Sequence, residues 1–334
     1  MLILAKTVLG IMLGFIISVI VGFVLIPILK KINFGQKINS YLNKNHQKKE
    51  GTPTLGGLIF IIPVVLALLL LYLRGSINIS LNLIILIFVF LSYGLLGFLD
   101  DYLKLKRHDD ISGNEGLTSI QKLVLQVIIA IVFFFIYKQT GGTGDLTFSL
   151  FGLNFQMGWA YGLFILLVLV ATTNAVNITD GLDGLAGGLS IFAFIAFGLI
   201  AWNTTWLEGH EEIAIFSSLL IGALGGFLLF NSHPARVFMG DTGSLALGGA
   251  LATIAILTRH EFSLILVGGV FVIETLSSLI QIIAIRKFKT KVFKKAPLHH
   301  HFEELGWSET DIVKVFWSIG FILAMFGIIY GVWL

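Results

Sequence analysis

The chain has 334 residues, of which 56% are hydrophobic and only 12% are charged, with a net charge of +3 and a mean hydropathy of +0.94. A soluble domain carries about 25% charged residues, so this composition excludes a soluble globular protein and indicates an integral membrane protein. The chain contains no cysteine, which excludes disulfides and thiol chemistry.

Ten apolar runs approach the roughly 20 residues that a helix needs to cross a hydrocarbon core. The first run is too long for the core of a signal peptide and has no evident cleavage site, so we expect it to be retained. We predict an all-α polytopic protein, with one domain over residues 1–334. Its ten transmembrane helices are expected near residues 8–29, 54–73, 82–99, 120–137, 158–174, 184–202, 213–230, 243–258, 262–285 and 311–333.

Lysine and arginine collect in alternate loops. Seventeen of the 22 lie in the loops after odd-numbered spans, and three lie in the other loops. Because these residues accumulate on the cytoplasmic side, we predict that the odd loops are cytoplasmic and that both termini are extracytoplasmic. An alternating pattern with a glycine turn predicts a small outer β-hairpin near residues 146–157.

The first polar motif on the predicted cytoplasmic side runs from Lys48 to Gly57. Thr52 and Pro53 suit the cap and the first turn of a helix, so we expect a helix start with free amide hydrogens here. Lys48 and Lys49 either obey the positive-inside rule or contact anionic lipid. Composition alone does not separate these readings.

Asp100 and Asp101 close the third run. Acids at a helix end are often solvated at the membrane interface, but two acids at the negative end of a helix dipole are unfavourable without a cation. A bound metal or Lys104, one turn on, would remove this penalty. Since acids are rare in such segments, we favour a functional role.

A short polar loop from Asn174 to Gly188 leads into the sixth run. Thr179 or Asp180 suits a simple helix cap, and the glycines suit close packing. Alternatively, Asp180 and Asp183 would share a face if helical, with Asn177 nearby. Such a face suits a hydrogen-bonding ligand or a hard cation.

The segment from Asn231 to Ser244 passes Phe238 and Asp241 and runs into the eighth span. A helix start offers amide hydrogens and positive potential to a phosphate. Asp241 is either the helix cap or a metal ligand. Oxygen ligands in a chain without cysteine favour Mg²⁺ or Mn²⁺ over zinc.

Three adjacent histidines, His299, His300 and His301, lie in the last large polar loop. On a helix their side chains point in different directions, so they would not all bind one ion. They form either a solvated loop or a phosphate-binding or metal-adjacent motif.

All of these acids and histidines fall in the odd loops, although they were not used to assign the topology. Acids, a divalent cation and anion-binding helix ends on one membrane face suit phosphoryl transfer, where positioning and charge neutralisation supply most of the catalysis. Such a site implies one substrate in the bilayer and one in the cytosol.

Five motifs together resemble the polyprenyl-phosphate N-acetylhexosamine-1-phosphate transferases over nearly the whole chain. They are Gly51-Thr-Pro-Thr-Leu-Gly-Gly, Phe98-Leu-Asp-Asp-Tyr, Asn177-Ile-Thr-Asp-Gly-Leu-Asp-Gly-Leu-Ala, the segment Asn231 to Gly243 and Pro297-Leu-His-His-His-Phe-Glu. The histidine motif and Gly-Thr-Pro-Thr resemble the branch that acts on UDP-N-acetylmuramoyl-pentapeptide. The related N-acetylglucosamine-1-phosphate transferases are the alternative.

The resemblance implies that undecaprenyl phosphate accepts phospho-N-acetylmuramoyl-pentapeptide, with Mg²⁺ as cofactor and UMP as product, on the cytoplasmic side of a bacterial plasma membrane. It also implies a homodimer among membrane lipids, and no nucleic-acid partner. The implied catalytic residues are Asp100, Asp101, Asp241 and His299, and the implied metal ligands are Asp241 and Asp183. The implied substrate-binding residues are Lys48, Lys49, Thr54, Lys104, Asn177, Asp180, Asp183, Asn231, Phe238, His300 and His301.

Two mechanisms stay open. The lipid phosphate attacks the β-phosphorus directly, with Asp100 removing any remaining proton, or a covalent phospho-aspartate forms on Asp101 or Asp241. Two other classes also use membrane acids. An intramembrane aspartyl protease would need its pair at membrane depth, and a cation-coupled transporter usually places acids mid-span within inverted repeats. Neither explains acids confined to one face.

Overall fold

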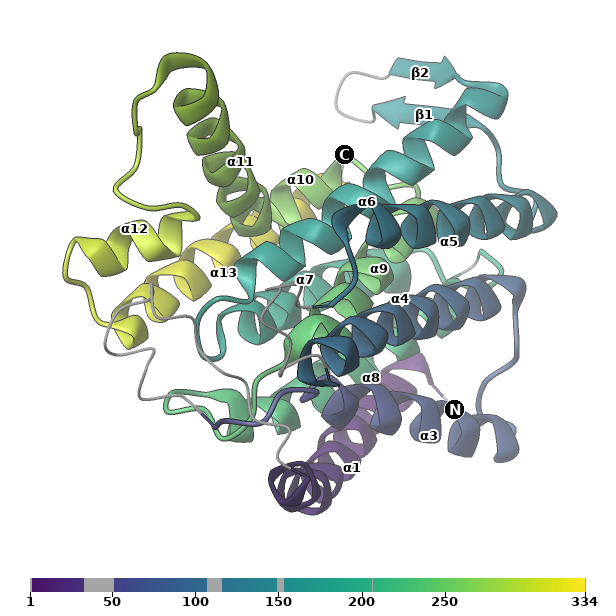
Figure 1. Ribbon diagram of the computed structural model, residues 1–334. Helices are drawn as coiled ribbons and strands as arrows, with labels where there is room; N and C mark the ends of the chain where they lie inside the picture. The colour runs from purple at the N-terminus through teal and green to yellow at the C-terminus, as the bar shows by residue number, and fades with distance from the viewer. Residues whose placement is uncertain (1, 33–50, 107–115, 149–152, 206, 334) are drawn as a thin grey trace.

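The computed structural model describes residues 2–32, 51–106, 116–148, 153–205 and 207–333. It is an all-α bundle with one small pair of strands (Figure 1). In chain order the helices are α1 (Ile3–Lys31), α3 (Leu58–Leu73), α4 (Leu81–Lys106), α5 (Ser119–Gln139), α6 (Tyr161–Thr179), α7 (Leu185–Asn203), α8 (His210–Asn231), α9 (Gly240–Leu257), α10 (Ser263–Val267), α11 (Gly269–Ile283), α12 (Leu298–Glu304) and α13 (Glu309–Trp333). A short 3-10 turn (Gly158–Ala160) precedes α6 and a π-helical turn (Ala284–Phe288) follows α11.

Nine helices of the described residues are long and apolar enough to cross a membrane. The chain is therefore an all-α, multi-pass membrane protein. A further apolar helix, α3, has 16 residues. At 1.5 Å per residue it is shorter than a typical hydrocarbon core of about 30 Å, so the total of ten spans stays a prediction.

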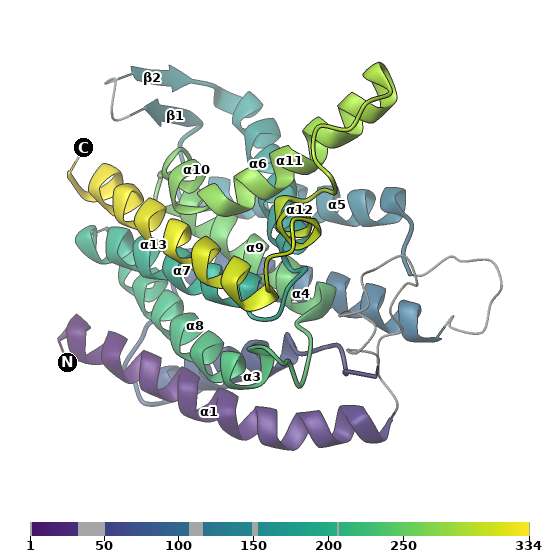
Figure 2. The ribbon, with the colours of Figure 1, turned by 90° about the vertical axis from the view of Figure 1, so that its left-hand side faces the viewer.

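The predicted ninth span is not one helix. The chain breaks at Gly268, between α10 and α11. Figures 1 and 2 both show α11 projecting away from the bundle. Gly268 and Gly269 explain the break, because glycine lowers the stability of a helix interior.

The predicted helix start at Thr52 is wrong. Residues 53–57 instead run beside the segment before α9, where the N–H groups of Phe238, Gly56 and Gly57 donate to the carbonyls of Pro53, Phe238 and Met239 at 2.8, 2.8 and 2.9 Å. Leu55 has a positive φ of 69°, which a helix does not allow. These tertiary contacts delay the helix to Leu58 and tie its start to that of α9.

The bundle is organised around α8 and α9. In an 18-residue window of each helix, 78% of the residues in α8 and 89% of those in α9 are buried, against 28% in α1. α1 packs along α8, and the Ser18 hydroxyl donates to the carbonyl of Ala223 at 2.8 Å. The outer helices turn apolar side chains outward, which suits contact with lipid.

Both chain ends lie at the same end of the helices as the strands (Figure 2). Strands β1 (Asp145–Phe148) and β2 (Leu153–Gln156) pair antiparallel in the predicted range, with Asp145 opposite Gln156. The C-terminal ends of α4, α6 and α8 and the starts of α5, α7 and α9 lie at the other end. The site described next is formed there.

Candidate active site at one end of the bundle

Asp100 and Asp101 lie in the last two turns of α4 and are only 0% and 4% exposed. α4 crosses α9 at Gly97, where a Cβ atom would overlap the backbone carbonyl of Asp241. This close approach brings the end of α4 to the start of α9. Simple solvation at the interface is therefore the wrong reading of this acidic pair.

Asp101 caps α9 from the neighbouring helix. Its Oδ1 accepts the N–H of Asp241 at 3.2 Å, and its Oδ2 accepts the N–H and hydroxyl of Thr242 at 2.9 and 2.7 Å. Amides in a first helical turn have no partner within their own helix, and the positive helix end stabilises a carboxylate. Asp241 is therefore not the cap of α9, and its side chain is left for other contacts.

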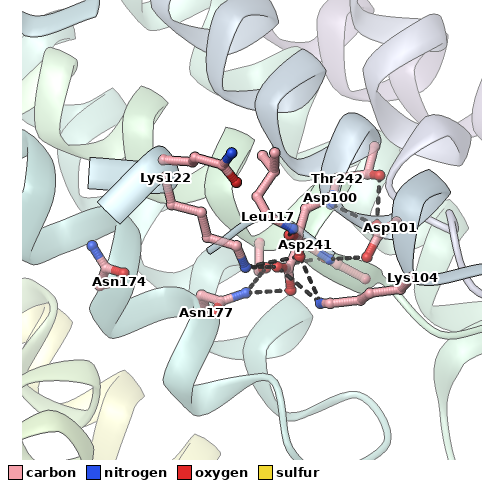
Figure 3. A network of polar contacts seen from close by, with 12 residues as sticks. Asp100, Asp101, Lys104, Leu117, Lys122, Asn174, Asn177, Asp241 and Thr242 are labelled. Carbon is pink, nitrogen blue, oxygen red and sulfur yellow. Dashed lines mark hydrogen bonds and ion pairs between the residues drawn. The ribbon is translucent and has the colours of Figure 1, made fainter. Parts of the chain in front are cut away.

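Asp241 contacts two lysines and one asparagine (Figure 3). Its Oδ2 lies 3.2 Å from Lys104 Nζ and 2.9 Å from Lys122 Nζ, and its Oδ1 accepts a hydrogen bond from Asn177 at 2.8 Å. The same two ammonium groups lie 2.7 and 2.8 Å from Asp100 Oδ2. Side chains from α4, α5, α6 and α9 thus meet at one point.

The donor set at this point fits a hard divalent cation. Carboxylate oxygens of Asp100, Asp101 and Asp241 lie within 4.8 Å of one another, and oxygen ligands of this kind suit Mg²⁺ or Mn²⁺. Lys104 and Lys122 supply positive charge to the same carboxylates. A cation bound there would compete with the two lysines, which would then be released toward an anionic ligand.

Asp183 lies in a second polar cluster, at the start of α7. Its Oδ2 lies 3.1 Å from His233 Nδ1 and accepts the N–H of Ala235 at 3.0 Å, while its own N–H donates to Glu309 at 2.7 Å. Asp183, His233 and Glu309 form a separate group of possible ligands. One ion shared by Asp183 and Asp241 stays a prediction.

The expectation of one helical face for Asp180 and Asp183 is wrong. Asp180 is the C-cap that follows α6, and Asp183 lies in the turn before α7. Gly184 has a φ of 77°, and its N–H donates to Asn231 at 3.0 Å, so the backbone turns sharply here. Neither Thr179 nor Asp180 caps α7, whose N-cap is Gly184.

Burial, with the nearby carboxylates of Asp241, Asp101 and Asp183, raises the pKa of Asp180 to about 8. The Asp180 carboxyl therefore keeps its proton at neutral pH until a cation or another ligand changes its surroundings. We call residues 180–184 the acidic turn.

Other predicted residues border the same region. Thr54 is buried beside Asp101, since a Cβ on Gly240 would lie 2.7 Å from the Thr54 hydroxyl and 2.6 Å from the Asp101 carboxylate. Phe238 is half-buried in the segment paired with residues 53–57. Lys48 and Lys49 lie outside the described residues.

The three histidines lie on α12, and the rings of His299 and His300 contact each other, with centroids 4.2 Å apart. His299 is only 1% exposed, whereas His300 and His301 are half-buried. Burial lowers the pKa of His300. Each Nδ1 has a different partner: Glu274 at 2.9 Å for His299, Glu303 at 2.6 Å for His300 and the N–H of Lys294 at 3.1 Å for His301.

Two residues of this region were missed by the sequence analysis. Lys122 follows Thr118 and Gln121, which form a capping box at the start of α5; that pattern could have placed Lys122 in the first turn, facing the acids. Glu274 is the single ionisable residue between positions 262 and 285. An isolated acid in an apolar run is itself a signal of function.

Comparison with known proteins finds relatives that match nearly the whole chain in sequence. Residues 83–259 match glycosyl transferase family 4. The phospho-N-acetylmuramoyl-pentapeptide-transferase of Bacillus subtilis is 49% identical over 324 residues, which is 97% of each chain. The proteins of that name from Bacillus licheniformis and a Geobacillus species are both 48% identical, over 97% and 98% of each chain.

Proposed function

The chain belongs to glycosyl transferase family 4 and, within it, to the phospho-N-acetylmuramoyl-pentapeptide transferases, and from this premise we propose how its polar end performs the transfer. The enzyme moves phospho-N-acetylmuramoyl-pentapeptide from a nucleotide carrier to a lipid acceptor in peptidoglycan biosynthesis. We propose UDP as the nucleotide part, undecaprenyl phosphate as the acceptor and UMP as the product.

One observation carries the proposal. Four helix ends bring Asp100, Asp241, Lys104, Lys122 and Asn177 into direct contact. Phosphoryl transfer needs groups that position and neutralise a diphosphate, with little covalent chemistry from the protein. Alternating positive and negative groups at a helix start meet that need, because the lysines can turn from the carboxylates to phosphate oxygens.

We assign the nucleotide to the acidic turn and its neighbours. Asn231 and Glu309 hold the backbone of this turn at Gly184 and Asp183, so it has one defined shape. Its carboxyl groups suit hydrogen bonds to base and ribose. The set proposed for substrate binding comprises Asn177, Asp180, Asp183, Asn231, Phe238, Lys104, Thr54, Lys48, Lys49, His300 and His301.

We propose Mg²⁺ as cofactor, held by Asp241 with support from Asp183. The cation would supply charge neutralisation at the diphosphate. In the described residues, carboxylate oxygens of Asp100 and Asp101 lie within 4.8 Å of a carboxylate oxygen of Asp241, so these acids are the alternatives to Asp183 as the second ligand.

In the direct mechanism, an oxygen of the lipid phosphate forms a bond to the β-phosphorus, and the bond from that phosphorus to the UMP oxygen breaks. A phosphate monoester has a second pKa near 6, so the acceptor is mostly ionised at pH 7 and needs little base catalysis. Asp100 remains our candidate base.

The covalent route is less well supported by the contacts. Both oxygens of Asp101 accept hydrogen bonds from the start of α9, which hold this carboxylate against the helix and lower its nucleophilicity. One carboxylate oxygen of Asp241 accepts a hydrogen bond from Asn177, and the other contacts two lysines. We therefore favour direct attack.

We propose that the site faces the cytoplasm of a bacterial plasma membrane, because most lysines and arginines fall in loops at this end. A UDP-sugar is a cytosolic substrate, and the lipid phosphate reaches the same face from the bilayer. We also propose a homodimer. Family membership sets aside the protease and transporter alternatives.

The test is exchange of radiolabelled UMP into the UDP-sugar by the purified chain in detergent, with lipid phosphate and Mg²⁺. Wild-type exchange that depends on both additions supports the proposal. A chain with Glu208→Gln, an exposed acid far from the site, serves as the matched control and should exchange at the wild-type rate. No exchange by folded wild type would refute the proposal.

A further inference from the structure

A buried pair of side chains, Glu274 of α11 and His299 of α12, lies behind the acidic turn. Glu274 is 0% exposed and His299 1% exposed. Glu274 Oε2 lies 2.9 Å from His299 Nδ1, and Glu274 Oε1 accepts the backbone N–H of His299 at 3.1 Å. One carboxylate thus fixes both the ring and the start of α12.

The far side of the imidazole faces the acidic turn. A Cβ atom on Gly181 would overlap the His299 ring at Nε2. Within the described part of the chain, Nε2 is buried without a hydrogen-bond partner. A buried nitrogen without a partner is unfavourable, and an apolar side chain would fill this space without that cost. Packing alone therefore does not explain an imidazole held by a carboxylate.

We propose that Glu274 is a positioning residue: through the His299 ring it fixes Gly181, and so places Asp180 and Asp183 for the nucleotide. The inference rests on the proposed function of the acidic turn. Because Glu274 Oε1 accepts from the backbone, Oε2 receives the Nδ1–H, and Nε2 presents its lone pair to the turn.

Glu274→Gln tests this arrangement with almost no change of shape. The amide oxygen of the glutamine can still accept the His299 N–H, but its NH₂ group then faces Nδ1. The ring proton must move to Nε2, next to Gly181, as in other carboxylate–histidine pairs where an amide imposes the wrong tautomer.

We expect Glu274→Gln to weaken binding of UMP to the purified chain about tenfold, the size of one charge-assisted hydrogen bond. The KM for the UDP-sugar should rise by a similar factor, while kcat changes less. The control is Glu261→Gln, a buried acid at the opposite end of the bundle, which should bind UMP as wild type does.

Two further variants separate this role from general stability. In a chain that already carries His299→Ala, adding Glu274→Gln should change UMP affinity by less than about twofold, because the two residues act as one unit. Gly181→Ala should weaken UMP binding strongly, but only slightly when His299→Ala has made room for the methyl group.

Wild-type UMP affinity in Glu274→Gln, or independent effects in the double variant, would overturn the inference while leaving the proposed function intact. If Glu274→Gln does not fold, the pair Gly181→Ala and Gly181→Ala/His299→Ala decides in its place. Failure of folded wild-type chain to bind UMP would overturn the proposed function, and this inference with it.

Discussion

The two ends of the bundle each bury carboxylates, but the side chains that contact these carboxylates differ. At the site end, Asp100 and Asp241 share two lysines. At the opposite end, Glu261 is 5% exposed and accepts a hydrogen bond from the neutral hydroxyl of Tyr161. Several charged groups buried in one place are costly unless a ligand uses them, whereas one acid with one neutral donor is a common structural pair.

The surroundings of Glu261 agree with a structural role. Arg259 donates to the Asp145 carbonyl at 2.8 Å and to Thr143, which ties strand β1 to the end of α9. The Tyr137 ring packs at a tilt against that of Tyr161, with centroids 5.8 Å apart. Burial of an acid is thus not enough to identify a site, and the number of charged groups that converge is more informative.

The largest expected effect is at Asp241. Asp241→Asn keeps the size of the side chain and can still accept from Asn177, but it loses the charge that faces Lys104 and Lys122 and that would hold the proposed Mg²⁺. We expect turnover to fall on the order of 10³-fold, with little change in the thermal unfolding midpoint. UMP release by purified protein measures this, and activity within tenfold of wild type would contradict the assignment.

Lys122→Met should have the next largest effect. It removes one of two cations shared by the central acids, and a lost charge contact to a diphosphate typically lowers the rate about 10²-fold. The matched control is Lys138→Met, at the other end of the same helix. If both variants release UMP at similar rates, Lys122 does not contact the substrate.

The next effect, about tenfold, concerns how the apparent affinity for Mg²⁺ changes with pH. With a pKa of about 8, Asp180 becomes negatively charged only near that pH. Its charge then adds to the attraction of the neighbouring Asp241 and Asp183 for a cation, so apparent Mg²⁺ affinity should rise up to about tenfold per pH unit as pH approaches 8. Titrations of UMP release with Mg²⁺ between pH 6 and 9 measure this. Asp180→Asn should flatten the dependence of Mg²⁺ affinity on pH. An unchanged slope in that variant would show that another group titrates.

The smallest effect on activity is expected at Glu261. Its pKa is raised by burial, so its favourable contribution to folding is present at low pH and is lost as pH rises through the raised value. Glu261→Gln mimics the protonated acid. The variant should release UMP at a rate within about twofold of wild type, and its free energy of unfolding should change by about 1 kcal/mol. It should also lose the pH dependence of thermal unfolding that comes from Glu261. A large loss of turnover would erase the contrast between the two ends.

Much of the architecture follows from the sequence. Long apolar runs specify membrane helices because unsatisfied backbone groups are not tolerated in lipid, and the acids at their ends meet as expected. The need for a cation beside Asp100 and Asp101 was also foreseen, and Lys104 meets it. Local patterns were sufficient where burial and helix electrostatics act within one element.

Contacts between elements were not predictable in the same way. Thr52 and Pro53 have the local chemistry of a helix start, but pairing with Phe238 and Met239 keeps the segment extended. Asp241 has the position of a cap, yet Asp101 from another helix takes that place. Periodicity and capping rules describe one segment at a time, so they did not reveal which distant segment satisfies its backbone.

The central claim is that the acids at one end of the bundle form the transfer site and face the cytosol. Sealed membrane vesicles test it directly, with labelled UMP and UDP-N-acetylmuramoyl-pentapeptide added from outside, since neither crosses a bilayer. Inside-out vesicles should exchange label at once, and right-side-out vesicles only after permeabilisation. Equal exchange by intact right-side-out vesicles would contradict the claim, because the site would then face away from its proposed cytosolic substrate.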